Sequence, residues 1–273
     1  MDYVTQSIEL KGVANARQLG GYLTEEGRRV KKDVLLRTGG LFRAEEGAVK
    51  ALEEKYLLSD IVDLRMNAEV SVMPDPTVKG AKYHHFSILE ELPIKEEEFQ
   101  TYLTLMSIED VGQRYAAIYD ANFDIDMEGI YISMVFGTEG KKGYKKLFDV
   151  LLSKEEKAAV LFHCTQGKDR TGMGAMLILG TLGVDEATIK EDYLLTNEAY
   201  KPTFKRIEEC IKSASLDENV LKFAMLLEGV RLSYIDAAYN KIKAEYGDIL
   251  GYVTKELGLS KNDVEDFKKM YLE

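Results

Sequence analysis

Short hydrophobic runs bounded by turn residues mark four places where we expect β-strands. They are residues 34–37, 60–65, 83–88 and 158–162, which are rich in aliphatic and β-branched side chains. The glycine pairs at 20–21 and 39–40 and the Pro-Asp-Pro segment at 74–76 lie between or beside these runs. The first 165 residues therefore predict several short strands, with the last of them leading into residue 163.

Helical spacing of hydrophobic residues fills most of the remaining chain. It is seen at residues 49–56, in a mostly helical stretch from 96 to about 136, and at 144–151, where the spacing is i, i+3, i+4, i+7. The chain after Thr171 looks helical throughout, with Asp185 and Ser260 as expected N-caps. The order of the elements predicts an α/β fold with a helical C-terminal half.

The domain organisation is predicted from length and from the absence of internal boundaries. The chain has 273 residues, of which 45% are hydrophobic and 30% charged, which is ordinary globular composition. No repeat of 20–50 residues and no Pro/Gly/Ser-rich linker divides it. We therefore expect one domain over residues 1–273.

The charge balance excludes one class of partner and constrains another. Asp and Glu total 47 against 36 Lys and Arg, a formal net charge of −11, which argues against a surface that binds nucleic acid. An anionic substrate must therefore meet a local basic pocket.

Cysteine usage and hydropathy bear on location. If Cys164 is catalytic, Cys210 has no partner for a structural disulfide, which suits a reducing compartment. The N-terminus lacks the features of a signal peptide, and the longest apolar run, 174–184, is shorter than the ~20 residues of a membrane span. We expect a soluble, cytoplasmic protein without an integral membrane segment; secretion is the alternative if an export signal has been removed.

Residues 163–172, His-Cys-Thr-Gln-Gly-Lys-Asp-Arg-Thr-Gly, combine the parts needed to hydrolyse a phosphate monoester. Such a reaction requires an anionic nucleophile, donors for the phosphoryl oxygens and a proton for the leaving group. Cys164 lies where a predicted strand gives way to a loop that opens a helix, and backbone N–H groups and a helix N-terminus stabilise both a thiolate and a bound phosphate. We therefore expect phosphate to be bound by the loop residues Thr165, Gln166, Gly167, Lys168, Asp169 and Arg170.

Individual positions in this loop have separate expected roles. Arg170 can hold two phosphoryl oxygens through its planar guanidinium, and Gly167 permits the backbone to curl. Thr171 can donate its hydroxyl to the Cys164 sulfur when water breaks a phosphocysteine intermediate. His163 is expected to anchor the loop through hydrogen bonds rather than to transfer protons.

This loop resembles the HCxxGKDRTG signature of the bacterial tyrosine and dual-specificity phosphatases, members of the cysteine-phosphatase superfamily. Residues 15–22 also resemble the family's NFRDLGGY opening, 36–39 its LxRS turn, and 62–69 its DLRxxxE segment. The resemblance implies a mostly parallel central sheet flanked by helices. It also implies a metal-independent hydrolase of phosphotyrosine, and in some relatives of phosphoserine, phosphothreonine and phosphoinositides, with no cofactor. In relatives a helical lid covers the site, and here residues 193–244 are long enough to form one.

Two departures from the family pattern affect substrate preference more than chemistry. Ala16 and Gln18 replace the aromatic and acidic residues of the family's opening, and Gln166 stands where alanine is common. Both changes could alter the floor or mouth of the pocket.

The resemblance also indicates the proton donor. Relatives with a GKDR loop use the loop aspartate, so Asp169 is our first choice for the general acid, and pairing with a neighbouring lysine or arginine or helix capping is its alternative role. The chain has no tryptophan, and we interpret Asp75, in Met-Pro-Asp, as a turn residue rather than the acid of a mobile loop. Asp63, at the end of a buried strand, is expected to orient Arg170 or another loop element.

Lys168 and the remaining histidines complete the candidate chemistry. Lys168 adds a positive charge useful for a polyphosphorylated inositol, or is a solvated loop lysine. His84 and His85 are adjacent on a predicted strand and so face opposite sides, and we therefore expect no metal site.

Three other functions compete with a protein phosphatase. A phosphoinositide phosphatase is favoured by Lys168. A sulfurtransferase also uses a loop cysteine but has no need of Asp169 and Thr171 beside the arginine. A non-catalytic phosphate-binding module would be expected to lose its nucleophile, whereas Cys164 is present.

Overall fold

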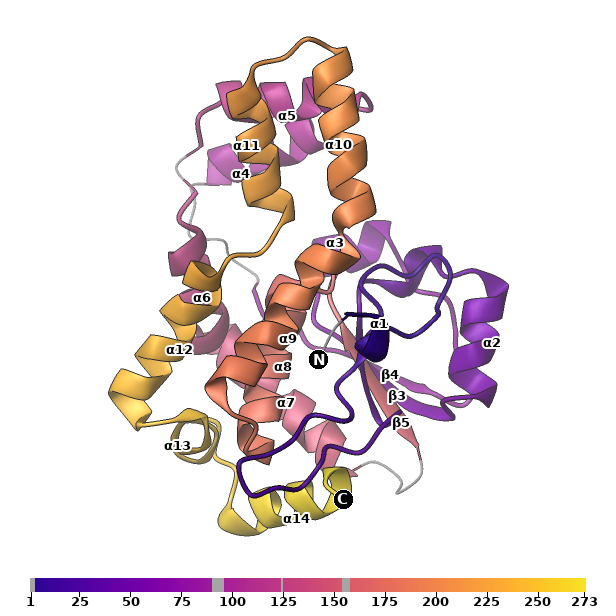
Figure 1. Cartoon of the computed structure of the whole chain (residues 1–273), viewed down its shortest axis with the longest axis vertical. Helices are drawn as coiled ribbons and strands as arrows, with labels where there is room; N and C mark the ends of the chain where they lie inside the picture. Colours follow the sequence, from indigo (N-terminus) through magenta and orange to yellow (C-terminus); the bar gives the residue numbers. More distant parts are fainter. Residues whose placement is uncertain (1–2, 90–95, 124, 154–157) are drawn as a thin grey trace.

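A five-stranded sheet forms the centre of the computed structural model, which describes residues 3–89, 96–123, 125–153 and 158–273 (Figure 1). The strand order is β1-β2-β5-β3-β4. β1 is antiparallel to β2, and the other neighbours are parallel. The bounds are β1 Arg17–Gln18, β2 Leu35–Thr38, β3 Leu58–Asp63, β4 Lys82–His85 and β5 Ala159–His163. The predicted α/β architecture with a mostly parallel sheet is confirmed.

Each face of the sheet is buried, which explains why its strands are continuous hydrophobic runs rather than alternating ones. Along β5, Val160 and Phe162 belong to the larger hydrophobic core, and Ala159 and Leu161 belong to a second core on the opposite face. β5 lies between β2 and β3, so the residues that follow it emerge at the middle of the carboxyl edge of the sheet. Ligands of parallel α/β sheets bind at this edge.

Helices account for most of the rest of the chain. The N-terminal half contains α1 Tyr3–Gln6, η1 Leu41–Arg43, α2 Glu46–Glu54, α3 Asn67–Val72, α4 Glu96–Met106, α5 Val111–Asp120, α6 Met127–Phe136 and α7 Thr138–Ser153. The C-terminal half contains α8 Asp169–Leu182, α9 Glu186–Ala199, α10 Lys201–Ser213, α11 Glu218–Glu228, α12 Leu232–Tyr246, α13 Ile249–Lys255 and α14 Lys261–Tyr271. None of the helices in the described ranges is long and apolar enough to cross a membrane.

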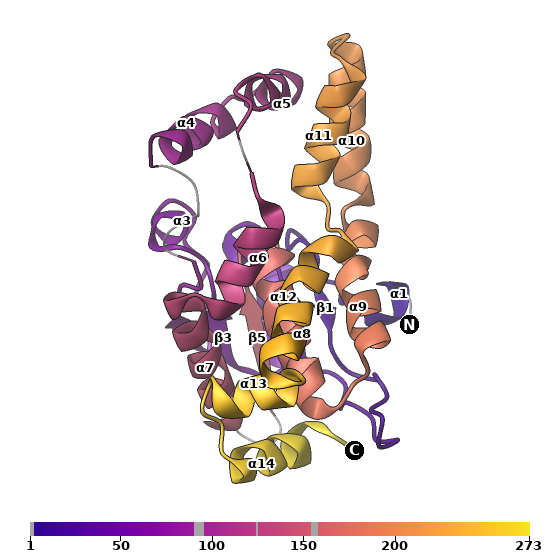
Figure 2. The same cartoon turned by 90° about the vertical axis from the view of Figure 1, so that its left-hand side faces the viewer.

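Four helices stand above the sheet in the views of Figure 1 and Figure 2: α4, α5, α10 and α11. Residues of α5, α10 and α11 share a small hydrophobic core that is separate from the two cores of the sheet; its buried members are Tyr115, Ile207, Ile211, Val220 and Ala224. This helical layer corresponds to much of the expected lid segment 193–244, and it also includes α4 and α5 from earlier in the chain.

Local sequence signals account for several element boundaries. Asp185 and Ser260 cap α9 and α14, as predicted, by accepting hydrogen bonds from Thr188 N and Asp263 N. β3 ends at Asp63, two residues before the predicted end. The Asp63 side chain accepts a hydrogen bond from the backbone N–H of Arg65, which turns the chain out of the ladder.

Candidate active site

A strand, a tight loop and a helix follow one another at the candidate site, formed by β5, residues 164–168 and α8. Cys164 is buried at the start of the loop, and Asp169 and Arg170 form the first turn of the 14-residue helix α8. The N-terminus of such a helix carries partial positive charge and unpaired N–H groups. The loop and helix together can therefore hold both a thiolate and a phosphoryl group.

Gly167 allows the loop to close against β2. Its φ is +66°, a conformation that residues with a Cβ rarely adopt. A Cβ at this position would also lie 2.4 Å from the carbonyl carbon and oxygen of Thr38. Glycine is therefore required here for both reasons.

The loop is held from outside through its carbonyl oxygens. Gly40 N donates to Thr165 O at 3.0 Å, Tyr200 Oη donates to Gln166 O at 2.8 Å, and Gly167 O accepts from Asn15 Nδ2 at 2.8 Å and from Arg37 Nη2 at 3.0 Å. Three successive carbonyl groups of the loop therefore have hydrogen-bond donors in other parts of the chain, which fixes the loop backbone.

Arg170 is held by Glu69, a residue of α3 that the sequence showed only as the end of a weak motif. Nη1 and Nη2 of Arg170 both donate to the Glu69 carboxylate, with Nη2 at 2.9 Å from Oε1. The Thr165 hydroxyl also donates to Glu69 Oε1. Glu69 thus fixes the arginine at the end of the loop and a threonine near its start.

The ion pair between Arg170 and Glu69 affects the pKa values of both residues more than their burial does. Burial by itself lowers the pKa of Arg170, but the Glu69 carboxylate and its hydrogen bonds raise that pKa above the ordinary value. Burial likewise opposes the charge on Glu69, yet Arg170 and the hydrogen bonds from Arg170 and Thr165 lower the pKa of Glu69 to about 2. Both residues are therefore charged at neutral pH.

The candidate acid Asp169 lies beside the phosphate loop with its carboxylate held from two sides. Tyr131 of α6 donates its hydroxyl to Asp169 Oδ1, and Lys168 Nζ lies 3.7 Å from Oδ2. The side chain of Asp169 retains 20% of its exposure, so part of the carboxyl group is accessible. No pattern in the sequence pointed to Tyr131, which lies 38 residues from Asp169.

Two loop side chains contact α11 in the helical layer. The buried Lys168 donates through Nζ to the Leu227 carbonyl, and Gln166 Nε2 donates to Glu228 Oε2 at 2.8 Å. Tyr115 of α5 donates to the other oxygen of Glu228 at 2.6 Å. Lys168 is thus neither the solvated lysine of one expectation nor, in this conformation, free to meet a second phosphate.

Asp63 does not orient Arg170, which corrects one of the two roles expected of it. It accepts instead from Arg65, with Nη2 to Oδ2 at 2.6 Å, and from Tyr83 Oη of β4 at 2.6 Å. Burial opposes the charge on Asp63, but the nearby His163 and then the hydrogen bonds from Arg65 and Tyr83 lower the pKa of Asp63 to about 2.

Asp75 is more than a turn residue. It accepts from Leu41 N and from Arg65 Nη2, both at 2.7 Å, and its Oδ2 lies 3.1 Å from His163 Nε2. The other ring nitrogen of His163, Nδ1, lies 3.2 Å from the carbonyl oxygen of the next residue, Cys164. Asp75 is therefore part of the support beneath the loop and is too enclosed to act as a mobile acid.

Asp63, Asp75 and His163 also bring three metal-ligating groups within 4.8 Å of one another. Arg65 already donates to both carboxylates, so a metal ion there would lie beside a guanidinium cation. We therefore assign this cluster a supporting role.

A second buried ionic network supports the loop from β1 and β2. Asp192 of α9 pairs with Arg17 at 3.3 Å and with Arg37 at 2.6 Å, and it accepts from Tyr22 at 2.9 Å. Burial and the charge of Arg17 lower the pKa of Arg37 to about 10. Sequence patterns pointed to residues 15–22 and 36–39 only as family segments, without this pairing.

The departures from the family pattern fall at different distances from the loop. Ala16 is buried in the core on the α2 side of the sheet, and Gln18 Oε1 accepts from Asp33 N at 2.8 Å; within the described part of the chain, neither side chain hydrogen-bonds to the phosphate loop. Gln166, in contrast, binds Glu228 above the loop. Thr171 Oγ1 is buried and, within the described ranges, has no hydrogen-bond partner, so its donation to sulfur stays a prediction.

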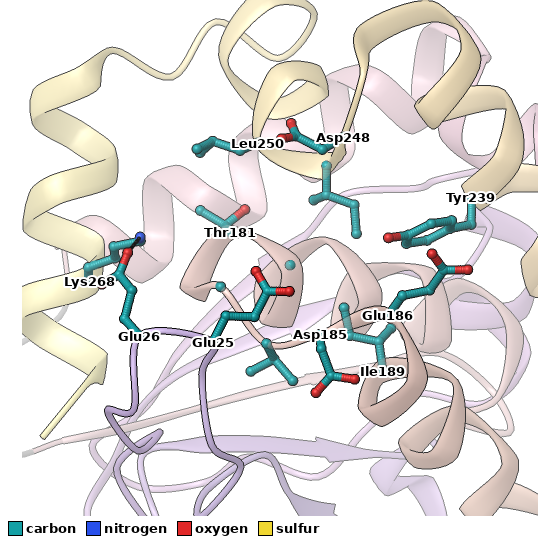
Figure 3. A pocket seen from close by; sticks show the side chains of 14 residues that line it. Glu25, Glu26, Thr181, Asp185, Glu186, Ile189, Tyr239, Asp248, Leu250 and Lys268 are labelled. Atoms are coloured by element: carbon teal, nitrogen blue, oxygen red, sulfur yellow. Dashed lines mark hydrogen bonds and ion pairs between the residues drawn. The ribbon is translucent and has the colours of Figure 1, made fainter.

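A hollow of about 380 Å³ lies elsewhere, at the C-terminal end of α8 (Figure 3). Since Gly180 on its lining is eleven residues beyond Asp169, the two ends are about 16 Å apart along the helix. The lining carries five acidic residues and one lysine: Glu25, Glu26, Asp185, Glu186, Asp248 and Lys268. It is unsuited to phosphate and is not the catalytic pocket.

Comparisons with known proteins agree with the geometry. The chain matches the model of the tyrosine phosphatase family over residues 8–273. It is 30% identical to a protein of Cupriavidus necator named as a candidate tyrosine-protein phosphatase, over 95% of this chain and 86% of the relative. It is 28% identical to the triple specificity protein phosphatase PtpB of Mycobacterium tuberculosis, over 87% of this chain and 92% of the relative. A tyrosine-protein phosphatase of Nostoc commune is 28% identical over 88% of this chain and 74% of the relative. With its cysteine loop at the carboxyl end of the central strand, the chain belongs to the tyrosine phosphatase family and is a phosphatase.

Proposed function

We propose that this phosphatase hydrolyses phosphorylated protein side chains, phosphotyrosine above all, through a covalent phosphocysteine intermediate. The observation that carries the proposal is the placement of Cys164 and Arg170 at the two ends of one closed loop, at the N-terminus of α8. A phosphoryl group in that loop meets the nucleophile, the guanidinium and the helix N-terminus together.

In the first step the Cys164 thiolate attacks phosphorus and forms the S–P bond. The P–O bond to the leaving group breaks, its electron pair stays on the leaving oxygen, and Asp169 gives that oxygen a proton. In the second step water attacks phosphorus, Asp169 takes a proton from it, and the thiolate leaves. Arg170 and the loop N–H groups stabilise the charge on the phosphoryl oxygens in both steps.

The breadth of the substrate range is a separate part of the proposal. One relative is named a triple specificity phosphatase, which supports testing phosphoserine and phosphothreonine beside phosphotyrosine. A phosphoinositide is the second candidate; Lys168, 3.7 Å from Asp169, could meet a second phosphate once its contact with Leu227 O is broken. Two further statements stay predictions: that the protein acts in the cytoplasm, and that residues 1–273 form a single domain.

Phosphate release from a substrate panel tests the proposal, with phosphotyrosine, phosphoserine and phosphothreonine peptides, phosphoinositide headgroups and nitrophenyl phosphate. Cys164→Ser should abolish turnover and still bind vanadate, because the loop donors and Arg170 remain. Cys210→Ser is the matched control, since this cysteine lies on α10, and it should retain wild-type rates. Turnover in a metal chelator should be unchanged. Retained turnover in Cys164→Ser would show that the nucleophile lies elsewhere.

A further inference from the structure

The buried tyrosine Tyr131 contacts the candidate acid from a helix outside the phosphate loop. Tyr131 belongs to α6 and is fully buried, as is its neighbour Tyr193 of α9. Two buried hydroxyl groups are costly unless they are hydrogen-bonded. Phenylalanine would fill nearly the same volume without this cost. The hydrogen-bond partners of the two hydroxyl groups therefore explain why tyrosine is found at both positions.

The two hydroxyls form a directed chain that ends on Asp169. Tyr193 Oη lies 2.7 Å from Tyr131 Oη, which in turn bonds to Asp169 Oδ1. An ionised carboxylate can only accept, so Tyr131 must donate its single proton to Asp169, and Tyr193 must then donate to Tyr131. Burial, and next the charge of Asp169, raises the pKa of Tyr131 well above its ordinary value, so the donor keeps its proton at any working pH.

The rings are fixed as firmly as the hydroxyls. The Tyr131 ring packs edge-on against Tyr193, with centroids 6.2 Å apart and an interplanar angle of 86°, and lies 5.5 Å from the Tyr234 ring. A donor held by packing on both sides restrains the acceptor it binds. Oδ1 of Asp169 is therefore occupied, whereas the one polar partner of Oδ2 among the described residues is Lys168 Nζ, at 3.7 Å.

We propose that Tyr131, supported by Tyr193, is a positioning residue for the proton donor: it holds Asp169 by Oδ1 and leaves Oδ2 to carry the proton that the leaving group takes. The inference rests on the proposed role of Asp169 as general acid. When the P–O bond breaks, the proton moves from Oδ2 to the leaving oxygen, and Asp169 becomes the anion that Tyr131 stabilises.

Other groups also surround Asp169. Those that interact with it from the loop and the surrounding helices are Lys168, Arg170, Tyr102, Tyr144, Tyr193 and Tyr234. Replacing Tyr131 by phenylalanine removes the hydrogen bond to Oδ1 and leaves these side chains in place, so the variant tests that one contact.

Leaving-group dependence tests the proposal, with Tyr131→Phe, Tyr193→Phe and Asp169→Asn compared on a phosphotyrosine peptide and on nitrophenyl phosphate. Nitrophenolate leaves without a proton, and the tyrosine phenolate needs one. Tyr131→Phe should lose about tenfold or more in kcat on the peptide and much less on nitrophenyl phosphate. A change in its pH profile should likewise appear on the peptide and not on nitrophenyl phosphate. Tyr193→Phe should show the same selectivity with a smaller loss.

The double variant separates a proton-donor role from general damage. Tyr131→Phe combined with Asp169→Asn should lose no more peptide activity than Asp169→Asn alone, because both changes act on one step. Tyr252→Phe is the matched control: this buried tyrosine donates to Val135 O on the same helix α6, at 2.5 Å, and its loss should leave the substrate ratio and the pH profile unchanged.

Two results would overturn the inference. If Asp169→Asn loses the peptide selectively but Tyr131→Phe and Tyr193→Phe lose both substrates equally or neither, Asp169 is the acid and Tyr131 does not position it. If Asp169→Asn shows no selective loss, the proposed acid is wrong and this inference fails with it. Should Tyr131→Phe not fold, Tyr193→Phe decides, and no selective loss in that variant counts against the proposal.

Discussion

Glu69 binds both terminal nitrogens of Arg170 and so determines how the phosphate loop presents its guanidinium. The contact is bidentate, with Nη2 to Oε1 at 2.9 Å, and it joins α3 to the first turn of α8 across 101 residues of sequence. Because an arginine has five N–H donors in a rigid plane, Nε and the remaining N–H groups stay available for phosphate. The carboxylate therefore orients the arginine and need not compete with substrate.

Replacing Glu69 by glutamine should weaken catalysis through Arg170. Glutamine keeps an acceptor for the Met66 N–H, which Glu69 caps at 2.8 Å, but lacks the charge that holds the guanidinium. We expect kcat/KM to fall by about 10- to 100-fold for all phosphate esters alike, since Arg170 serves every substrate. Steady-state kinetics on two substrates measure this. Glu54→Gln, at an exposed position of α2, is the control, and a fall below threefold in Glu69→Gln would argue against the orienting role.

Acid should destabilise the fold through Glu69 and Asp63, whose pKa values are each about 2 in the folded protein. Because these values are below those of the unfolded chain, the stabilisation is complete above about pH 5 and is lost as the pH falls toward 2. Urea unfolding at about pH 6 and about pH 3 should show this loss. Glu69→Gln should lose less stability over the same interval, by on the order of 2 kcal/mol. Equal losses of stability in Glu69→Gln and in the wild type would contradict a contribution of Glu69 to the acid sensitivity.

Alanine at position 167 should disrupt the loop more than its size suggests. The backbone there has φ +66°, and the added Cβ would meet the Thr38 carbonyl at 2.4 Å. The left-handed conformation alone costs roughly 1–2 kcal/mol, and the close contact adds to it. Gly167→Ala should lower the melting temperature and reduce vanadate binding. Gly27→Ala is a useful control, because Gly27 also has positive φ but nothing lies within 4 Å of its added Cβ. Equal behaviour of the two variants would mean that the contact with Thr38 is unimportant.

Lys168→Ala tests whether phosphoinositides are substrates that use this cation. Its ammonium group now bonds to Leu227 O at the end of α11, so reaching a second phosphate requires that contact to break. If Lys168 binds phosphate groups beyond the one that is hydrolysed, the variant should lose more activity on polyphosphorylated headgroups than on phosphotyrosine peptides. Lys145→Ala, on the exposed side of α7, serves as the control. The same loss on both substrates would reject the role.

Much of this fold follows from local sequence patterns. Hydrophobic runs identified β2, β3, β4 and β5, helical spacing identified α2 and α7, and Asp185 and Ser260 marked helix starts. The short β1 and α3 were not predicted, because two and six residues carry too little periodicity. The phosphate loop was predicted because its nucleophile, turn glycine and arginine are continuous in sequence.

The supports of that loop were decided by tertiary structure. Glu69 on Arg170, Tyr131 on Asp169 and Glu228 on Gln166 are contacts between residues 101, 38 and 62 positions apart. No local pattern encodes such pairs, because each depends on how separate helices pack around the carboxyl edge of the sheet. The sequence by itself thus determined the chemistry of the site, since that chemistry lies in one short segment. Which side chains hold its arginine, its acid and its glutamine was decided only when the helices closed around it.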